Sequence, residues 1–575
     1  MYTLGINAAF HDSAACLVRD GAVVAAAEEE RFNRVKHAKR PVPFSAWELP
    51  YHAIDYCLRE AGIHLADVDH VAYSYDPRLF PGRPPEGEAI MLPQRPSEVK
   101  PSESHANPWD ALFYAYLVNA PLQLKGGAPL HLRKRLNGAP QPRFEWHYVG
   151  HHLAHEASAF LAAPCERCAV MTLDGRGERA TTTFGVWRDG EYRRLKQIEV
   201  PHSLGLLYED VTNYLGFLHS SDEYKVMALA SYAQPTYLDD FRDIVRVDEE
   251  GGYRIVDADL AGRFGAPRAP GGPMEKRHYQ VAASLQKALE ETALKLARWL
   301  RDETGERQLA MAGGVALNCV MNARVRDSGL FESVWVQPAA GDAGTALGAA
   351  LWIDHERRKN GARWHMTHAN LGPGYADEEI EQLLRWSRLP YRRLDEIADE
   401  TADLLARDRI IGWFQGRMEF GPRALGARSI LASPISPEMQ GRLNELKDRE
   451  DFRPVAPAVL EERLDEWFES AQPQPSAPFM LFIYDVKPGR AEHIPAACHV
   501  DGTARVQTVD RASNPRYYDL LRAFEQRTGV PVLINTSFNS RGQPIVCSPR
   551  DAIEAFYSTP LDALVIGSFL LQKTA

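Results

Sequence analysis

The chain has 575 residues, of which 45% are hydrophobic and 25% are charged, and its formal net charge is −11. This length suffices for two to four domains with cores of their own, and the composition is that of an ordinary globular protein. The negative charge argues against a general nucleic-acid binder or a binder of anionic membranes, so any anionic ligand must be held by a local site.

Cysteine usage and the N-terminus predict the compartment. The seven cysteines are scattered, and an odd number at low density favours a reducing environment over a disulfide scaffold. The first residues, MYTLGINAAFHDSAACLV, lack the basic head and long apolar core of a signal peptide. The sequence contains no run of about 18 apolar residues, so we expect no transmembrane helix. We therefore expect a cytoplasmic protein without a membrane partner.

Two similar strand-and-hairpin units are expected in the first part of the chain. YTLGINAAF predicts a strand, and SAACLVRDGAVVAAAEEERF predicts a hairpin that turns at Asp20-Gly21. The same order returns in CAVMTLDGRGE and TTTFGVWRDGEYRRL, which turns at Asp189-Gly190. Between the two units, residues 77–108 are rich in proline and polar groups and predict a long excursion from the fold.

A long helix and two glycine turns follow. VAASLQKALEETALKLARWLRDETG predicts an amphipathic helix that ends at Gly305, with Leu285, Leu289, Leu296 and Leu300 on one face. RQLAMAGGVALNCVMNARV and VWVQPAAGDAGTALGAALWIDHE each predict a strand, a glycine turn and a helix. Such units suit an α/β nucleotide-binding fold. Glycines and a proline in residues 359–379 predict a domain boundary near residue 360.

The stretch HYVGHHLAHEASAF places His151 and His155 four residues apart. On a helix both lie on one face, where they either bind one metal ion or serve as structural histidines. A zinc-peptidase pattern would need glutamate at position 152, which is histidine. Asp174 and Asp342 follow predicted strands, where open α/β folds bind ligands. Two imidazoles with one or two carboxylates suit iron, zinc or manganese.

Other polar residues lie at comparable places. His11 and Asp12 follow the first predicted strand, and Gly313 and Gly314 precede a helix, where glycines let the backbone approach a nucleotide. Asp222, in SDEYKVMALAS, either serves catalysis or forms a surface salt bridge with the nearby lysine.

The second part of the chain is rich in arginine. Seven basic residues lie between positions 417 and 453, together with six acidic ones. Arg417 and Arg423 lie in the glycine-rich stretch GRMEFGPRALG, and Arg505 and Asn535 follow later. Guanidinium groups bind phosphate through paired hydrogen bonds, so a small phosphate-bearing molecule is the expected ligand. The alternative is that these arginines tie loops together through salt bridges.

Together these stretches resemble the O-carbamoyltransferases of the NodU/CmcH type, whose members act on nodulation factors, cephamycins and tobramycin-like antibiotics. Eleven pieces occur in family order over nearly the whole chain. They are FHDSAACLV, EEERFNRVKH, HHLAHEASAF, LDGRGE, DEYKVMALA, GGVALN, AAGDAGTALGA, GRMEFGPRALGARSI, KDREDFRPVAPAV, HVDGTARVQTV and NTSFN.

The resemblance implies an α/β fold in two domains. Residues 1–358 should form a duplicated actin-like ATPase domain of the tRNA threonylcarbamoylation type, and residues 359–575 a YrdC-like domain. Family chemistry implies that carbamoyl phosphate is cleaved to carbamate in the second domain. ATP then converts carbamate to carbamoyl adenylate in the first domain, and the carbamoyl group passes to a hydroxyl of a small-molecule acceptor. Residues 77–143 differ in character and are expected to be an insert that sets acceptor specificity.

The resemblance also implies residue roles. His151, His155 and Asp342 should hold a metal, expected to be Fe(II), with Asp174 joining directly or through water. ATP should bind with Mg. His11 and Asp12 match the acceptor-side loop, and one of them is the expected general base, with Asp222 nearby. The nucleotide should face Gly177, Gly313, Gly314 and Asn318. Carbamoyl phosphate should be held by Arg417, Arg423, Lys447, Arg453, Arg505 and Asn535.

Three rival functions remain at this stage. A tRNA threonylcarbamoylation-type enzyme would use threonine and bicarbonate, but the net charge and the lack of a basic stripe argue against tRNA. An actin-like sugar kinase would need neither His151 nor the arginine-rich second domain. A non-enzymatic nucleotide-binding module would keep the glycine turns without the metal set. The acceptor, the native metal and the oligomeric state are not encoded in any pattern of the sequence.

Overall fold

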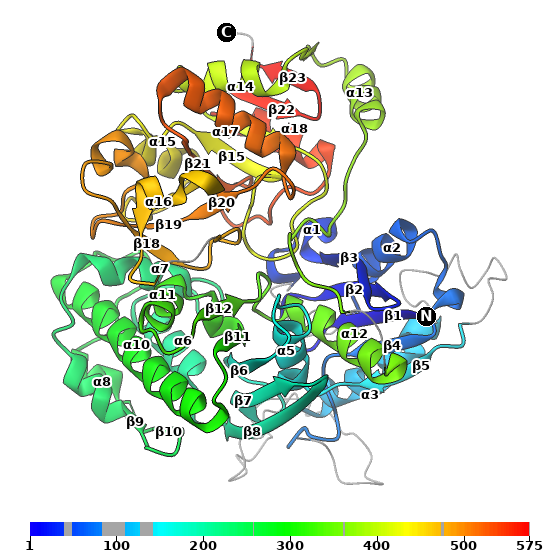
Figure 1. Cartoon of the computed structure of the whole chain (residues 1–575), viewed down its shortest axis with the longest axis vertical. Coiled ribbons are helices and arrows are strands. Elements are labelled where there is room, and N and C mark those ends of the chain that lie inside the picture. The colour runs from blue at the N-terminus through cyan, green and yellow to red at the C-terminus, as the bar shows by residue number, and fades with distance from the viewer. Residues whose placement is uncertain are drawn as a thin grey trace.

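The computed structural model describes residues 1–38, 49–82, 110–126, 142–256, 258–359, 363–472 and 476–573. Figure 1 shows two α/β lobes: the N-terminal lobe runs from blue to green, and the C-terminal lobe, from yellow to red, lies against one side of it. In the described part of the chain, no helix has the length and hydrophobicity needed to cross a membrane. Of the expected insert, residues 77–82, 110–126 and 142–143 are described, and the remainder lies outside the described residues.

The first lobe contains two five-stranded sheets with the same topology. The strand order is β3-β2-β1-β4-β5 in one sheet and β8-β7-β6-β11-β12 in the other. In each sheet the first three strands are antiparallel neighbours, and the last two continue in parallel. The expected duplication is therefore confirmed. The strands are β1 (Tyr2–Asn7), β2 (Ala14–Arg19), β3 (Ala22–Glu28), β4 (His70–Tyr73), β5 (Glu145–Tyr148), β6 (Cys168–Leu173), β7 (Ala180–Arg188), β8 (Glu191–Glu199), β11 (Gln308–Ala312) and β12 (Ser333–Val336).

Both expected Asp-Gly hairpins are confirmed. Asp20 and Gly21 have φ of 50° and 88°, and Asp189 and Gly190 have φ of 56° and 79°. Two consecutive residues with positive φ form the turn that matches the twist of a two-residue hairpin, and Asp-Gly favours it because both residues tolerate this region. These hairpins set the register of β2 with β3 and of β7 with β8.

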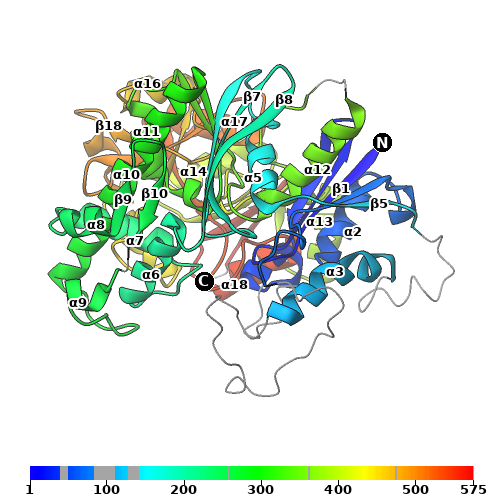
Figure 2. The same cartoon turned by 90° about the horizontal axis from the view of Figure 1, so that it is seen from below.

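Two helices are exchanged between the duplicated halves. Helix α5 (His151–Phe160) follows the first sheet in the chain but packs on β6, β7 and β11 of the second. Helix α12 (Ala343–Arg358) follows the second sheet but packs on β1, β2 and β4 of the first. Figure 2 shows the two helices side by side between the sheets. Their close approach requires Gly348, because a Cβ there would lie 1.8 Å from the carbonyl oxygen of Ala154.

The expected amphipathic helix is α10 (Lys276–Thr304), which buries its leucine face and ends at Gly305 with φ of 68°. The other elements of the first lobe are α1 (Glu30–Asn33), α2 (Tyr51–Glu60), α3 (Asp110–Gly126), α6 (Leu204–Tyr214), α7 (Glu223–Leu229), α8 (Leu238–Ile244), β9 (Val245–Val247), β10 (Tyr253–Ile255), α9 (Leu260–Phe264) and α11 (Cys319–Asp327).

The second lobe begins after a stretch without regular structure. Its described part, residues 363–376, contains no helix or strand. A mixed eight-stranded sheet follows, with order β13-β23-β22-β14-β15-β21-β16-β20, and a three-stranded sheet, β17-β18-β19. The strands are β13 (Arg392–Arg393), β14 (Ile411–Phe414), β15 (Arg428–Ala432), β16 (Ala456–Leu460), β17 (Phe468–Glu469), β18 (Ile483–Val486), β19 (Thr503–Arg505), β20 (Gln507–Val509), β21 (Val532–Ser537), β22 (Ala563–Ile566) and β23 (Phe569–Gln572). The helices are α13 (Asp377–Trp386), α14 (Ile397–Ala406), α15 (Met439–Leu446), α16 (Leu464–Trp467), α17 (Pro515–Thr528) and α18 (Pro549–Ser558).

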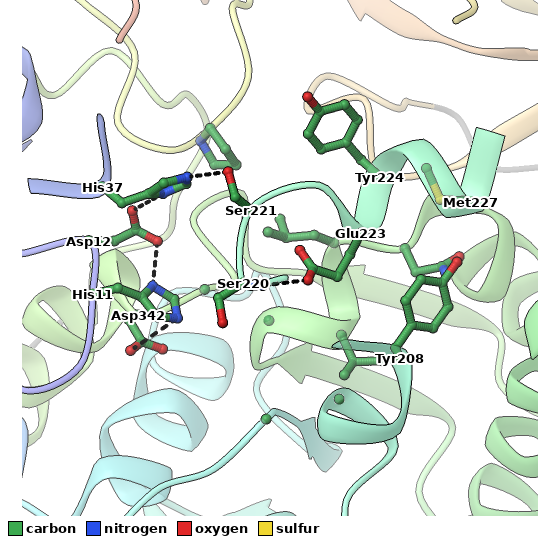
Figure 3. A pocket seen from close by; sticks show the side chains of 18 of the residues that line it. His11, Asp12, His37, Tyr208, Ser220, Ser221, Glu223, Tyr224, Met227 and Asp342 are labelled. Atoms are coloured by element: carbon green, nitrogen blue, oxygen red, sulfur yellow. Dashed lines mark hydrogen bonds and ion pairs between the residues drawn. The ribbon is translucent and has the colours of Figure 1, made fainter. Parts of the chain in front are cut away.

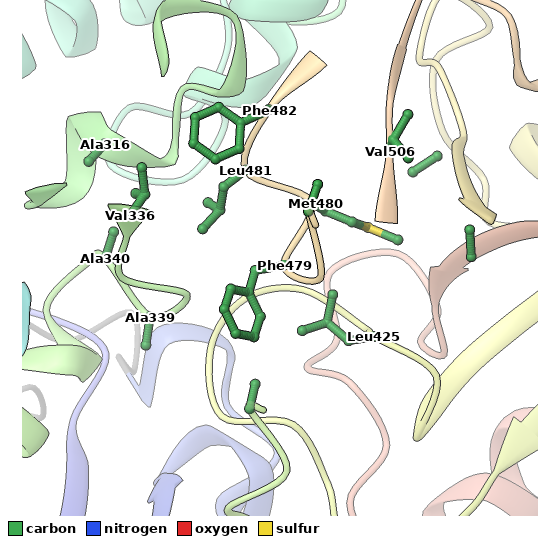
Figure 4. Close-up of a cluster of buried hydrophobic side chains, with 14 of the residues drawn as sticks. Ala316, Val336, Ala339, Ala340, Leu425, Phe479, Met480, Leu481, Phe482 and Val506 are labelled. Atoms are coloured by element: carbon green, nitrogen blue, oxygen red, sulfur yellow. The ribbon is translucent and has the colours of Figure 1, made fainter. Parts of the chain in front are cut away.

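The two lobes share one apolar core. A loop of the second lobe, residues 479–482, contributes four buried side chains to a cluster with Ala316, Val336 and Ala339 of the first (Figure 4). Because this contact is buried and hydrophobic, the lobes on either side of the expected boundary near residue 360 are packed against each other.

Candidate active site

Four buried side chains converge where the two halves of the first lobe meet. His151 and His155 lie one turn apart on α5, Asp174 follows β6, and Asp342 caps α12 without a side-chain hydrogen bond to that helix. Their ligand atoms all lie within 4.8 Å of one another. Asp174 is held in place because its Oδ1 accepts a hydrogen bond of 2.8 Å from the backbone N–H of Gly314.

The spacing of these atoms fits a divalent metal ion. The two Nε2 atoms are 3.2 Å apart, and they lie 3.5–3.8 Å from an oxygen of Asp174 and of Asp342. An ion with bonds of about 2.1 Å would place tetrahedral ligands about 3.4 Å apart. Two imidazoles and two carboxylates therefore form a mixed nitrogen and oxygen donor set of the kind that iron, zinc or manganese accepts.

Electrostatic coupling holds this cluster together in the protein alone. Burial acts to lower the pKa of His151, but the charge of Asp342 and hydrogen bonds to both aspartates raise it well above its usual value. Burial acts to raise the pKa of Asp342, yet the charges of His11 and His151 hold it well below. Each carboxylate thus favours the ionised form, which is the form that binds cations.

The neighbouring His152 does not join the set. Its ring packs under the loop after β6, and a Cβ on Gly177 would lie 2.7 Å from its Nδ1. Burial lowers the pKa of His152 to about 3, so this ring is neutral. Gly177 lines the cavity of the site, and it is the absence of a side chain there that lets the loop close over His152.

A chain of hydrogen bonds lies beside the metal set (Figure 3). The carboxylate of Asp12 forms two hydrogen bonds of 2.8 Å, one with Nδ1 of His11 and one with Nδ1 of His37. His37 Nε2 lies 3.1 Å from the hydroxyl oxygen of Ser221, and His11 Nε2 lies 3.8 Å from Asp342. Burial acts to raise the pKa of Asp12, but the charges of His37 and His11 hold it well below its usual value.

Three of the four predicted nucleotide-facing residues line the same cavity, namely Gly177, Gly314 and Asn318. Asn318 caps α11 by accepting a hydrogen bond from the N–H of Met321. Gly313 is placed differently: it has φ of 94°, and a Cβ there would lie 2.2 Å from the carbonyl oxygen of Leu173. Gly313 therefore lets the turn pass close to β6 and does not line the cavity.

The far end of the cavity is strongly basic. Arg423, Arg453, Arg505 and Asn535 line it, as expected from the sequence. Lys447 stands behind this wall and donates to Ser537 Oγ at 3.0 Å and to Asn539 Oδ1 at 2.8 Å.

Burial and crowded positive charge at this end favour the binding of an anion. Burial, together with the charge of Arg505, lowers the pKa of Arg423 to about 9. Burial, together with the charge of Arg453, lowers the pKa of Arg449 to about 9, and burial also brings the pKa of Lys447 well below its usual value. Buried Nε of Arg423 and Nη2 of Arg449 find no hydrogen-bond acceptor among the described residues. A bound anion would relieve both deficits.

Arg417, which the sequence assigned to this anion site, lies elsewhere. Its guanidinium donates to the carbonyl oxygens of Leu371 at 2.7 Å and Val24 at 3.1 Å, and it pairs with Glu60. These partners satisfy it, and it does not line the cavity. We therefore correct its role to a contact between the lobes.

Asp222 also lies outside the cavity lining. Its carboxylate pairs with Lys225 at 3.0 Å, and Lys225 pairs in turn with Glu450 of the second lobe at 2.9 Å. This is the salt bridge with the nearby lysine that the sequence offered as the alternative, and it favours a structural role for Asp222. Its neighbour Glu223 lines the cavity instead.

The lining also includes residues that the sequence did not assign to the site, among them His37, Ser221 and Arg449. In the sequence, Arg449 belongs to the stretch KDREDFRPVAPAV, and His37 is the last residue of EEERFNRVKH. A signal for His37 is the run of polar residues after β3, where Arg34, His37 and Ala38 all adopt positive φ. That tight turn folds the segment back onto the first loop.

A single cavity of about 2320 Å³ connects the metal set to the basic end. Asp174 and Asp342 line one end, and Arg423 and Arg505 line the other. The two sites therefore do not open into separate clefts.

Comparison with known proteins identifies the family. Residues 2–80 and 132–351 match the family model described as carbamoyltransferase N-terminus, and residues 402–573 match carbamoyltransferase C-terminus. The chain is an α/β enzyme that belongs to the carbamoyltransferase family.

Two relatives are nodulation proteins. Nodulation protein NolNO of Sinorhizobium fredii is 40% identical over 99% of this chain and 80% of its own length. Nodulation protein NolO of Bradyrhizobium diazoefficiens is 43% identical over 74% of this chain and 79% of its own. Among solved structures, full-length HypF in its phosphate- and nucleotide-bound form is 14% identical, with a TM-score of 0.33, over 63% of this chain and 56% of that one.

Proposed function

We propose that this carbamoyltransferase is ATP-dependent and acts on a hydroxyl of a small-molecule acceptor. Water hydrolyses carbamoyl phosphate to phosphate and carbamate at the basic end of the cavity. Carbamate then displaces pyrophosphate from ATP, which gives carbamoyl adenylate. The acceptor oxygen attacks the carbamoyl carbon, and AMP leaves.

The observation that carries this proposal is the continuous cavity between a basic end and a metal-binding end. Carbamate decomposes in water, so a route that keeps it enclosed preserves the intermediate between two reactions. Two separate functions would not require the two ends to share one space.

The basic end is suited to carbamoyl phosphate. Arg423, Arg449 and Arg505 are partly buried cations whose pKa values are lowered, so a phosphate dianion restores the charge balance there. Planar guanidinium groups can each donate two hydrogen bonds to phosphate oxygens. As carbamate leaves, the same donors hold the phosphate product.

The other end is suited to ATP and a divalent ion. We propose Fe(II) at His151, His155, Asp174 and Asp342, and Mg bound with the nucleotide. When bound, the ion at this centre would offset phosphate charge as ATP reacts. Gly314 and Asn318, which line this part of the cavity, would contact the nucleotide.

An aromatic wall near the metal set is suited to an acceptor. Phe10, Tyr75, Phe80 and Phe113 lie in mutual ring contact and line the cavity. Phe80 and Phe113 belong to the 77–143 insert, which supports a role of this insert in acceptor choice. Aromatic faces bind the apolar faces of ring compounds while leaving hydroxyls free.

The first experiment mixes purified, iron-loaded protein with ATP and carbamoyl phosphate, without an acceptor. Pyrophosphate is measured enzymatically, and carbamoyl adenylate by mass spectrometry. We expect both products only when carbamoyl phosphate is present, and neither from His155→Ala. A panel of hydroxyl compounds then identifies the acceptor through a mass increase of one carbamoyl group.

Two results would contradict the proposal. Formation of ADP in place of AMP and pyrophosphate would indicate phosphoryl transfer of the kinase type. Intact ATP in every mixture, including those with the hydroxyl panel, would favour a nucleotide-binding module without this chemistry.

A further inference from the structure

Ser221, His37 and Asp12 form an ordered chain at the wall of the cavity (Figure 3). The hydroxyl oxygen of Ser221 is 3.1 Å from His37 Nε2, and His37 Nδ1 is 2.8 Å from Asp12 Oδ1. Serine, imidazole and carboxylate in this order are the groups by which a histidine takes a proton from a hydroxyl. Ser221 and His37 both line the cavity.

The hydrogen bonds determine where the protons lie. A carboxylate can only accept, so His37 donates through Nδ1–H to Asp12. In the tautomer that donates through Nδ1, Nε2 carries no proton and can accept from the hydroxyl of Ser221. Lys36 Nζ donates to the same hydroxyl oxygen at 3.4 Å, which leaves the Ser221 proton directed at His37.

His11 is arranged differently although it shares the same carboxylate. Its Nδ1 contacts Asp12 Oδ2 at 2.8 Å, but its Nε2 faces Asp342, a member of the metal set, at 3.8 Å. Among the residues that the structure describes, Nε2 of His37 lies next to the hydroxyl of Ser221. The position of a proton acceptor for a hydroxyl substrate is therefore filled better by His37 than by His11.

The fold fixes this arrangement on both sides. Asp12 adopts φ of 52° and His37 φ of 59°, and the N–H of Asp12 donates to the carbonyl oxygen of His37 at 3.1 Å. The N–H of His37 donates to Glu30 Oε2 at 2.6 Å. Two left-handed residues whose backbone N–H groups both donate hydrogen bonds indicate a conformation that the surroundings impose.

We propose that His37 is the general base for the acceptor hydroxyl and that Ser221 passes the proton to it. This inference rests on the proposed function. The acceptor O–H bond breaks, its proton moves to Ser221 Oγ, and the proton of Ser221 moves to His37 Nε2. The acceptor oxygen forms a bond to the carbamoyl carbon of carbamoyl adenylate, and the bond from that carbon to the AMP oxygen breaks.

The test separates formation of carbamoyl adenylate from its use. His37→Gln keeps a polar side chain that cannot take the proton. Acceptor-free pyrophosphate formation should stay within about twofold of the wild type, whereas transfer to an alcohol should fall at least about 100-fold, the usual size of a general-base effect. Methyl glucoside and glycerol serve as alcohol probes. Hydroxylamine, which attacks without a general base, should be carbamoylated at nearly the wild-type rate.

Variants of Ser221 and a matched histidine test the relay. Ser221→Ala should lose alcohol transfer, and Ser221→Thr, which keeps the hydroxyl, should retain it. His52→Gln is the control, because His52 also contacts a carboxylate, Glu29, but lies outside the cavity lining. It should change neither step.

Several outcomes would overturn the proposal. Equal losses of pyrophosphate formation and transfer in His37→Gln would indicate a structural role. A carbamoyl group found on Ser221 by mass spectrometry would make that serine a nucleophile. Nitrogen NMR of labelled histidines decides independently of any acceptor: His37 should carry its proton on Nδ1, and a proton on Nε2 would exclude it as the base. Absence of pyrophosphate from the wild type would instead count against the proposed function.

Discussion

Single side chains give the two ends of the cavity opposite charge, and each end has a residue whose removal has a distinct effect. His155 is buried in the metal set, and its loss removes one of four converging ligands. Mutation of a residue that supports a metal ligand typically lowers metal affinity about 10- to 100-fold. His155→Ala removes a ligand itself, so we expect a larger loss of metal affinity. Metal content after dialysis, measured by plasma mass spectrometry, checks this. His52→Ala should keep the wild-type content, and equal retention by both would contradict the site.

At the basic end, Arg505 and Arg417 form a contrasting pair. Arg505→Gln should weaken binding of inorganic phosphate about 10- to 100-fold, because a charge-assisted hydrogen bond contributes about 1.5–3 kcal/mol. Arg417→Gln should leave phosphate affinity unchanged, since its guanidinium is engaged by Leu371, Val24 and Glu60. Isothermal titration calorimetry measures both. Equal weakening would return Arg417 to the anion site.

The depressed pKa of Lys447 adds a pH effect. Burial and the charges of Arg449 and Arg453 lower that pKa in the free protein. A bound phosphate favours the charged amine and raises the pKa again. Between these two values Lys447 is neutral when free and charged when bound, so binding takes up a proton and weakens as pH rises through this window. Titrations in two buffers of different ionisation enthalpy should show the uptake, and Lys447→Met should abolish it.

How far the sequence predicts such residues depends on how local their surroundings are. The pair His151 and His155 follows from helical spacing alone. The site of Arg417 depends on contacts with Leu371 and Val24, which are far from it in sequence or belong to the other lobe. His37 meets Asp12 only because a turn with positive φ folds the chain back by 25 positions. The periodicity of the sequence does not predict such a contact between distant residues.

Among the elements, the crossing of α5 and α12 determines whether the metal set forms. A Cβ on Gly348 would lie 1.8 Å from the carbonyl oxygen of Ala154, so Gly348→Ala must force the two helices apart. We expect a loss of about 1–3 kcal/mol in the free energy of unfolding and weaker metal binding. Chemical denaturation and metal titration measure the two effects.

The matched control is Gly441 in α15, where no atom lies within 4 Å of a Cβ. Gly441→Ala should stabilise the protein by about 0.5 kcal/mol, because alanine loses less backbone entropy on folding. If both variants behaved alike, helix propensity and not the crossing would explain the result.

The sequence predicted the elements that have local signals, but it did not predict the exchange of α5 and α12 between the two halves. Both Asp-Gly hairpins and the leucine face of α10 follow from short-range chemistry. The sequence also predicted that the two units resemble each other. It did not predict that α5 and α12 each cover the sheet of the other half, since that depends on which of two similar sheets a helix meets.

For the molecule as a whole, the continuous cavity predicts how the carbamoyl group travels between its two ends. With carbamoyl phosphate at natural abundance and ¹³C-bicarbonate plus ammonia in solution, carbamoylated product should remain unlabelled if carbamate moves through the shared cavity faster than it exchanges with the solvent. Mass spectrometry of the product measures the label. Extensive labelling would mean that the intermediate escapes, or that bicarbonate is the source, as in threonylcarbamoylation.

The exchange of α5 and α12 makes the duplicated halves mutually dependent for folding. Each sheet is covered by a helix that lies on the other side of the junction between α5 and β6 in the chain. A polypeptide cut at that junction would yield two fragments. Each would expose the sheet face that the exchanged helix covers, and each would carry a helix without its packing partner. Such fragments should aggregate when made singly and recover one compact particle when made together. We therefore expect the two halves to fold only together, as the subunits of an obligate heterodimer do, although here they belong to one chain.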